Sequence, residues 1–219
     1  MALAKLKQET ERLYTVDEYL ELDRTSEERW QYLDGEVWMM AGESDEHGDI
    51  SVNLIAELRF QLKGKDCRVR AKDSKIKSGG FTRKVGQSKK GMFSYPDVVV
   101  ICDDVKYHDK KKDIILNPHV VIEVLSESTA DFDRGDKFTR YRMFNPTLTD
   151  YILVSQDKPL VEHFIRQDDD SWKLFVYIGL DKSFKIESIE CELKLSEIYD
   201  RVKFSKKALE FLEEIANIK

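Results

Sequence analysis

The sequence predicts one α/β domain, in which helices pack against a buried β-sheet. Its 219 residues suffice for one domain of ordinary size and are short for two complete ones. Hydrophobic residues make up 41% of the chain, which is enough to form a core. Two segments, 97–101 and 119–125, are almost continuously apolar, as expected of strands that are buried on both faces. Segments with helical spacing lie before and after them.

A short helix and a hairpin are predicted near the start of the chain. Thr15 is a suitable N-cap, because its hydroxyl can accept a backbone N–H and acidic residues follow in the first turn. Segments 30–33 and 37–40 have the composition of strands. Asp34 and Gly35 between them are a strong signal for a tight turn, so these segments predict a β-hairpin.

A longer helix is predicted over 47–62, because apolar residues recur there every four positions. The recurring positions are Ile50, Leu54, Leu58 and Leu62. Gly64 is typical of a helix end. Two short strand-like segments, 67–71 and 74–77, follow it.

The segment 78–91 is polar and rich in glycine, so we expect an exposed loop. It lies in a basic region, since residues 63–90 contain eleven Lys or Arg against two Asp, whereas the whole chain has a net charge of -6. A local positive field attracts polyanions even on an acidic protein. Two interpretations remain open, a nucleic-acid clamp and a solvated surface loop.

The second half of the chain predicts a helix over 132–144, which Asn145-Pro146 ends. Further expected elements are the strands 151–154, 160–166 and 172–178, and a C-terminal helix over 205–219 with Ser205 as its N-cap. No repeat or linker is evident, so residues 1–219 are expected to form a single domain with its core at about 14–204.

Two carboxylates mark the apolar strands as a candidate site. Asp97 follows Pro96 and begins the first strand, and Glu123 lies inside the second. An unpaired carboxylate among apolar neighbours is costly, so it shifts its pKa or binds a cation. If the strands are neighbours, their spacing of roughly 4.8 Å brings both carboxylates within reach of one hard cation. The alternative is structural, with Asp97 capping a turn and Glu123 paired to a core Lys or Arg.

The helix after the second strand carries Asp133, Lys137 and Tyr141 at positions i, i+4 and i+8, on one face. An ordinary surface ion pair beside a packing aromatic residue explains this spacing equally well. In the functional interpretation the ammonium lies over the carboxylates, where it can stabilise charge on a phosphate oxygen or orient water.

Together these features resemble the bacterial family of putative restriction endonuclease domains (Uma-two type) in the PD-(D/E)XK nuclease superfamily. The resemblance covers roughly residues 14–204 and rests on the order and spacing of several short motifs. These are residues 15–19 and 33–36, His47 with Ile50, Pro96-Asp97, residues 123–126 with Ser128-Thr129, Asp133, Lys137, Tyr141 and Asp150-Tyr151. It implies a restriction-endonuclease-like core, which is a mixed central sheet flanked by helices.

The resemblance also implies site roles. Asp97 and Glu123 hold a divalent metal, Mg²⁺ or Mn²⁺, and Lys137 takes the part of the catalytic lysine. The plain superfamily pattern has Lys at the position of Leu125, and the family's usual pattern has a lysine on the next helix instead. A further departure is Gln31, where relatives usually carry Glu. Possible supporting residues are Glu36, His47, Asp133 and Tyr141.

We therefore expect a Mg²⁺-dependent endonuclease that hydrolyses phosphodiester bonds, with DNA as the expected substrate and RNA not separable from it. Its expected backbone contacts are Lys75, Lys77, Arg83, Lys84, Lys89 and Lys90. A homodimer is expected from the family resemblance and from the apolar strands after residue 151. The alternative function is a catalytically silent oligomeric or nucleic-acid-binding module that keeps the nuclease fold.

Other classes of protein are disfavoured. The longest apolar runs fall far short of the roughly 20 residues of a membrane-spanning helix, and the first eleven residues lack the apolar core of an export signal. Cys67, Cys102 and Cys191 are odd in number and widely spaced, so neither a disulfide framework nor a cysteine-based zinc site is predicted. We expect a protein of the reducing cytoplasm, without membrane contact.

Overall fold

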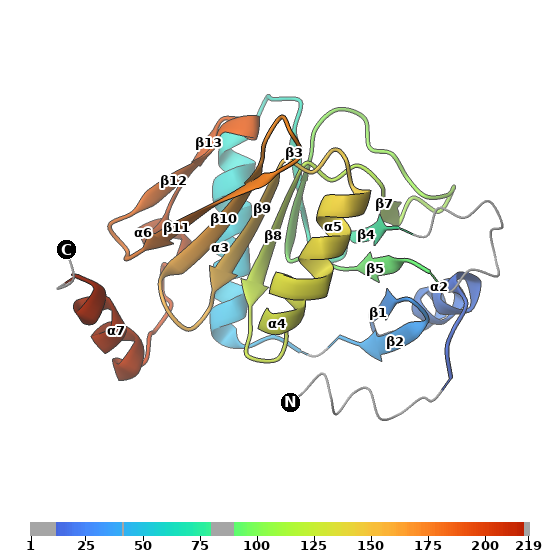
Figure 1. Cartoon of the computed structure of the whole chain (residues 1–219), viewed down its shortest axis with the longest axis horizontal. Coiled ribbons are helices and arrows are strands. Elements are labelled where there is room, and N and C mark those ends of the chain that lie inside the picture. Colours follow the sequence, from blue (N-terminus) through green and yellow to red (C-terminus); the bar gives the residue numbers. More distant parts are fainter. Residues whose placement is uncertain (1–11, 41, 80–89, 217–219) are drawn as a thin grey trace.

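The computed structural model describes residues 12–40, 42–79 and 90–216. Its central layer is a six-stranded sheet in the order β11-β10-β9-β8-β6-β3 (Figure 1). The strands are β3 (Arg68–Ala71), β6 (Val98–Ile101), β8 (Val120–Leu125), β9 (Asp150–Ser155), β10 (Leu160–Arg166) and β11 (Trp172–Ile178). β8 and β9 are parallel and the other neighbours are antiparallel, so the sheet is mixed, as predicted.

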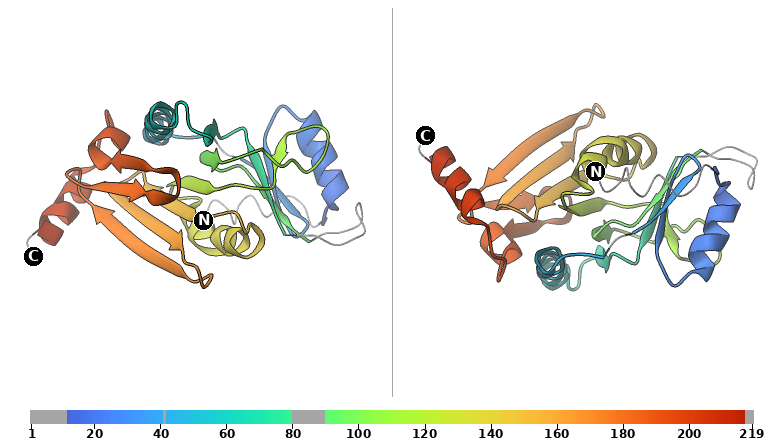
Figure 2. Two further views of the ribbon diagram at one scale, coloured as in Figure 1. Left: turned by 90° about the horizontal axis from the view of Figure 1, so that it is seen from above. Right: turned by 90° about the horizontal axis from the view of Figure 1, so that it is seen from below.

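Helices cover both faces of this sheet (Figure 2). One face packs against α3 (Asp45–Gln61), and the other against the continuous helical segment α4 (Ala130–Phe132), η1 (Asp133–Lys137) and α5 (Phe138–Phe144). Val98 of β6 belongs to the core on the α3 side, and Val99 belongs to the core on the α5 side. Alternate side chains of one strand therefore enter two cores, which explains why β6 and β8 are continuously apolar.

A second sheet of five strands lies beside the first, in the order β2-β1-β5-β4-β7. Its strands are β1 (Trp30–Leu33), β2 (Glu36–Met39), β4 (Lys75–Ser78), β5 (Met92–Ser94) and β7 (Ile114–Ile115). The predicted hairpin is present, with Asp34 and Gly35 at positive φ in its turn. Helix α2 (Val16–Thr25) packs on this sheet. Its N-cap is Thr15, whose side chain accepts a hydrogen bond from the Glu18 backbone N–H.

The remaining elements lie at the far end of the large sheet, beside β11 (Figure 1). They are β12 (Ser183–Ile186), η2 (Glu187–Ile189), β13 (Cys191–Lys194), α6 (Leu195–Ile198) and α7 (Lys206–Ala216). β12 and β13 form a two-stranded sheet whose apolar side chains complete the core on the α3 side. The predicted C-terminal helix is α7, and its first turn is capped by Ser205. No helix in the described ranges has the length and apolar character needed to cross a membrane.

The two ends of the predicted exposed loop at 78–91 are not exposed. Ser78 is the last residue of β4 and is fully buried, with its hydroxyl bonded to Asn145. Gly79 and Gly91 are buried as well, and the Gly91 backbone N–H donates to Asp34. Composition predicted a loop there but not its anchors, because the partners are distant in sequence. Residues 80–89 lie outside the described part of the chain.

The helix predicted over 132–144 begins earlier, at Ala130, and contains a π-helical turn at Asp133–Lys137. A π turn forms i→i+5 hydrogen bonds, so it inserts one extra residue relative to an α-helix and shifts the side chains that follow. Both Asp133 and Lys137 are buried at this turn. Turns of this kind are frequent at functional sites.

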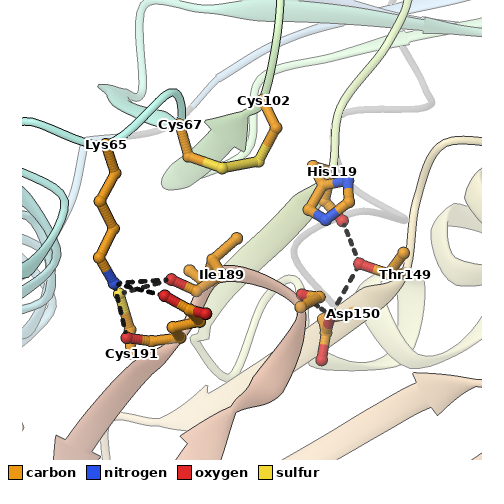
Figure 3. The surroundings of a disulfide bond; sticks show 10 residues. Lys65, Cys67, Cys102, His119, Thr149, Asp150, Ile189 and Cys191 are labelled. Atoms are coloured by element: carbon orange, nitrogen blue, oxygen red, sulfur yellow. Dashed lines mark hydrogen bonds and ion pairs between the residues drawn. A yellow bond between two sulfur atoms is a disulfide. The ribbon is translucent and has the colours of Figure 1, made fainter.

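The sequence predicted no disulfide framework and gave no sign of a single bridge, but Cys67 and Cys102 are joined by a disulfide (Figure 3). Cys67 directly precedes β3 and Cys102 directly follows β6, and the antiparallel register of these strands places the two residues opposite each other. Spacing in sequence gave no indication of this pairing, which depends on the register. Cys191 is buried and free. The cysteine content therefore gives no support to the expected reducing compartment.

Candidate active site

Asp97 and Glu123 lie side by side at one end of two adjacent strands. Val98 of β6 pairs with Ile122 of β8 in antiparallel register, so Asp97, one residue earlier, stands opposite Glu123, one residue later. Residues opposite each other across two strands point to the same face of the sheet. Asp97 is held in place by its Oδ2, which accepts a hydrogen bond of 2.7 Å from the Val124 backbone N–H.

The ammonium of Lys137 reaches the same face from the π turn. Its Nζ lies 2.8 Å from Oε2 of Glu123 and 2.9 Å from Oδ1 of Asp133. All three side chains are at least 95% buried. The predicted grouping of Lys137 with the strand carboxylate is therefore present, and Asp133 joins it.

Burial and charge act in opposite directions on this cluster. Burial raises the pKa of Glu123 well above its usual range, more than the nearby ammonium lowers it. For Lys137, burial by itself lowers the pKa, but the carboxylates of Asp133 and Glu123 outweigh burial and raise it. Two buried carboxylates thus share one ammonium, with the Asp97 carboxylate adding further negative charge. With all three carboxylates ionised, the cluster would carry more negative than positive charge, and a bound cation would relieve that excess.

His47 closes the other side of Asp97. Ser44 caps α3 by accepting a hydrogen bond from the His47 backbone N–H, and the first turn of this helix directs the imidazole at the sheet. Nε2 of His47 lies 2.8 Å from Oδ1 of Asp97. Burial lowers the pKa of His47, but the hydrogen bond and charge of Asp97 outweigh it and raise the pKa. His47 therefore contacts the candidate site directly.

These groups line a cleft of about 540 Å³ between the two sheets. Its walls include Asp97, Glu123, Asp133, Lys137 and His47. Other lining residues are Arg29, Gln31, Trp38, Lys72, Tyr95, Ser126, Phe132 and Gln156. Oε1 of Glu123 is buried here and has no hydrogen-bond partner in the described part of the chain.

Two of the predicted supporting residues are not in this cleft. Tyr141 is fully buried, and its hydroxyl lies 2.8 Å from the Ser94 hydroxyl. It can therefore support residues of the cleft but does not face the cleft itself. Glu36 is exposed at the hairpin turn and is not among the described residues that line the cleft. It does not replace the acidic group that Gln31 lacks.

The residues predicted to contact the nucleic-acid backbone lie in different surroundings. Lys75 is wrong as an exposed contact, because it is 2% exposed and forms an ion pair with Asp23. Lys77 is half-buried, with its ammonium 5.5 Å from the centre of the Phe93 ring. Lys90 is exposed and lies 4.0 Å from Asp34. The other three predicted contacts, Arg83, Lys84 and Lys89, lie outside the described residues.

Some cleft residues were not identified from the sequence. Arg29 and Lys72 are partly exposed residues of its lining, and each forms an ion pair, Arg29 with Asp73 and Lys72 with Glu43. Tyr95 lines the cleft, and its hydroxyl donates to Asp23, 2.9 Å from each oxygen of that carboxylate. Only the place of Tyr95, two residues before Asp97, was a signal in the sequence. Arg29 and Lys72 come from separate loops with no motif.

The residues present fit a divalent metal held by two carboxylates. Across the described residues, no group of three or more His, Cys, Asp or Glu side chains is arranged to hold a metal ion. However, Mg²⁺ is commonly bound through one or two carboxylates and keeps several waters. Glu123 has one unpaired oxygen, and the Asp97 side chain is 13% exposed, in the cleft. Asp97 and Glu123 would therefore be the ligands.

Comparison with known families agrees with this architecture. A family model described as putative restriction endonuclease, Uma2, matches residues 16–196. The chain belongs to the Uma2 family. The match spans every element from α2 to the start of α6, including both strand carboxylates and Lys137. The resemblance inferred from the motifs is confirmed.

Individual relatives agree with membership of the Uma2 family. The chain is 33% identical to the uncharacterized protein slr1290 of Synechocystis over 189 residues. This region covers 86% of this chain and 92% of that protein. The chain is 30% identical over 170 residues to the uncharacterized protein sll1609 of the same organism, covering 78% and 90%. Its fold is similar to the crystal structure of a putative nuclease of DUF820 from Anabaena variabilis, with a TM-score of 0.68, 15% identity, and coverage of 87% of this chain and 99% of the other. The predicted fold class is confirmed.

Proposed function

We propose that this protein is a Mg²⁺- or Mn²⁺-dependent endonuclease that hydrolyses phosphodiester bonds in DNA. One observation carries the proposal, namely that two carboxylates from adjacent strands and a buried ammonium from the next helix face one cleft. The membership of the Uma2 family and the structural similarity to a protein described as a putative nuclease both support it.

Each side chain has a separate part in the proposed reaction. Asp97 and Glu123 would hold the cation, which supplies Lewis acidity and activates water at neutral pH. Lys137 is fixed by Glu123 and Asp133, so its ammonium is already positioned for the negative charge that develops on a phosphate oxygen. Asp133 touches Lys137 rather than the proposed cation, and it would be a positioning residue.

DNA would enter from the rim of the cleft, where Arg29 and Lys72 lie. Phosphate contacts add to affinity by releasing counterions, so each lost contact lowers the salt dependence of binding by about one unit. We expect Lys72→Gln to weaken binding about equally for all sequences, because phosphate contacts carry no base information. The triple change Lys84→Gln, Lys89→Gln, Lys90→Gln tests the basic segment in the same assay.

A silent binding module is the second candidate, and two observations favour it. Lys137 is tied to two carboxylates, and the described residues offer only two proposed ligands for a metal. Such a protein would bind DNA with the same salt dependence and leave it intact. The two functions therefore differ in cleavage and agree in binding.

The test is incubation of the wild-type protein with supercoiled and linear DNA in Mg²⁺, Mn²⁺ or EDTA, with DNA binding measured in parallel. We expect nicked or linear products with either metal and none with EDTA. Binding without any product in Mg²⁺ and in Mn²⁺ would identify the silent module instead. In the same incubation with RNA, cleavage of RNA but not of DNA would show that RNA is the substrate.

A further inference from the structure

Among the residues that the structure describes, three oxygen atoms in the cleft are buried without a hydrogen-bond partner. They are Oε1 of Glu123, Oε1 of Gln31 and Oε1 of Gln156, and all three residues line the same cleft. An unsatisfied buried polar atom costs about 1–3 kcal/mol, so several in one place need an explanation. The two amide oxygens can only accept, and the Glu123 oxygen does the same when the carboxyl is ionised, so a cation or a hydrogen-bond donor would satisfy them.

Gln31 is the more buried of the two amides. It is 8% exposed and belongs to β1, in the small sheet, so it enters the cleft from the side opposite the strand carboxylates. Its backbone position is fixed by the hairpin, in which Gln31 pairs with Trp38. A buried amide on a rigid strand is preorganised to present its oxygen to a ligand.

We propose that Gln31 supplies, through Oε1, a neutral oxygen ligand for the cation held by Asp97 and Glu123, either directly or through one water. This inference rests on the proposed function, since it needs a cation between those carboxylates. Hard cations accept amide oxygens together with carboxylates. A neutral ligand leaves the site less negative than a third carboxylate would. The site therefore binds the cation more weakly and releases it more readily.

The test measures Mn²⁺ binding to the full chain by titration calorimetry, without substrate. We expect Gln31→Glu to bind Mn²⁺ at least about 10-fold more tightly than the wild type and Gln31→Leu at least about 10-fold more weakly. Gln61→Glu is the matched control, because Gln61 lies at the other end of α3 from His47 and bonds to the backbone of Glu192. It adds the same charge and should leave Mn²⁺ affinity unchanged.

Thermal unfolding in EDTA separates a ligand from a structural residue. Gln31→Leu removes a buried amide oxygen that has no partner among the described residues, so it should unfold at the same temperature as the wild type or higher, while its stabilisation by Mn²⁺ shrinks. A lower unfolding temperature in EDTA, with unchanged Mn²⁺ affinity, would make Gln31 a structural residue and overturn the inference.

The two proposals fail differently. If the wild type binds Mn²⁺ and both Gln31 variants bind it equally well, Gln31 is not a ligand and the proposed metal site stands. If a Gln156→Leu variant loses affinity instead, the neutral ligand is Gln156. If the wild type binds no Mn²⁺, the metal site and the role of Gln31 are both wrong.

Discussion

Lys137 neutralises only part of the negative charge that surrounds it. Its ammonium contacts Glu123 and Asp133, and Asp97 lies on the same face. A buried ion pair contributes little net stability, but a buried charge without a partner is strongly destabilising. The stability of the protein should therefore respond in opposite ways to the loss of the ammonium and the loss of one carboxylate.

Lys137→Met should lower the free energy of unfolding by about 3–5 kcal/mol, because it leaves two buried carboxylates uncompensated. Glu123→Gln should leave it unchanged or raise it in EDTA, although both variants should lose cleavage. The sign follows from the raised pKa of Glu123: an acid with a higher pKa in the folded state costs stability above its unfolded pKa, and Gln avoids that cost. Urea denaturation at pH 7 checks both variants. A large destabilisation by Glu123→Gln would show that the carboxylate is structural.

At the scale of elements, the π turn decides where Lys137 points. The extra residue of this turn sets the rotation between the residues before it and α5, whose Tyr141 and Phe138 are fixed in the core. Gly135 is exposed at the middle of the turn, and a Cβ added there would meet nothing within 4 Å. Changes at Gly135 can therefore separate two effects: a substitution changes the side chain alone, whereas a deletion changes the number of residues in the turn.

Deleting Gly135 should convert the turn to an α-helix and rotate the preceding residues by about 100° relative to α5. Either Asp133 is then displaced, or α5 moves and carries Lys137 with it, so we expect cleavage to be lost. Gly135→Ala is the control, and it should keep cleavage and stabilise the protein by about 0.5–1 kcal/mol. Plasmid cleavage and urea denaturation of both variants check this. Full cleavage by the deletion variant would contradict a role for the π turn.

A second connection between elements predicts a pH dependence of stability. Asp150 begins β9 and is buried, with Oδ1 2.7 Å from Nε2 of His163 in β10. Its Oδ2 accepts from Thr149, at 2.8 Å, and from Ser188 of η2, at 2.5 Å. Burial raises the pKa of Asp150, but these hydrogen bonds outweigh burial and lower it.

A lowered folded pKa means that this stabilisation is present above the unfolded pKa of about 3.9 and is lost as the pH falls through the folded value. Asp150→Asn should therefore lower the free energy of unfolding by about 1.5–3 kcal/mol near neutral pH, and the difference from the wild type should shrink below about pH 4. Urea denaturation from pH 3 to 7 measures it. The exposed Asp104→Asn should show no such trend, and a constant difference across this range for Asp150→Asn would contradict the account.

Sequence patterns predicted the parts of this fold that are local. The apolar runs gave β6 and β8 with their carboxylates, and helical spacing gave α3 and Lys137. The predictions that failed concerned residues whose partners are distant in the sequence. Lys75 seemed available because its partner Asp23 lies 52 residues away. The π turn has no composition of its own. The sequence marked Gln31 as a departure from the family pattern, but the place of its unpaired oxygen in the cleft depends on the packing of the two sheets.

At the scale of the whole molecule, the cleft lies between two sheets and the disulfide lies elsewhere. Cys102 follows the end of β6, whereas Asp97 precedes its start, so the two are about 16 Å apart at the rise of a strand. The disulfide closes a loop with a sequence separation of 35 residues. It constrains the unfolded chain without touching the candidate site.

Reduction should lower the free energy of unfolding by about 3–4 kcal/mol and leave the cleavage rate unchanged. Urea denaturation with and without a phosphine reductant measures the first effect, and plasmid nicking measures the second. The double variant Cys67→Ala, Cys102→Ala should be insensitive to the reductant. A loss of cleavage on reduction, in a protein that remains folded, would show that the disulfide controls the site.

The most direct test of the central claim is the rate of plasmid nicking in Mg²⁺ by the wild type and by Asp97→Asn, with the exposed Asp104→Asn as control. Asp97→Asn preserves the shape of the side chain and removes its charge, so both the hydrogen bond from Val124 and the fold should survive. The account predicts a loss of at least about 100-fold for Asp97→Asn and none for the control. Equal rates for all three proteins would contradict it.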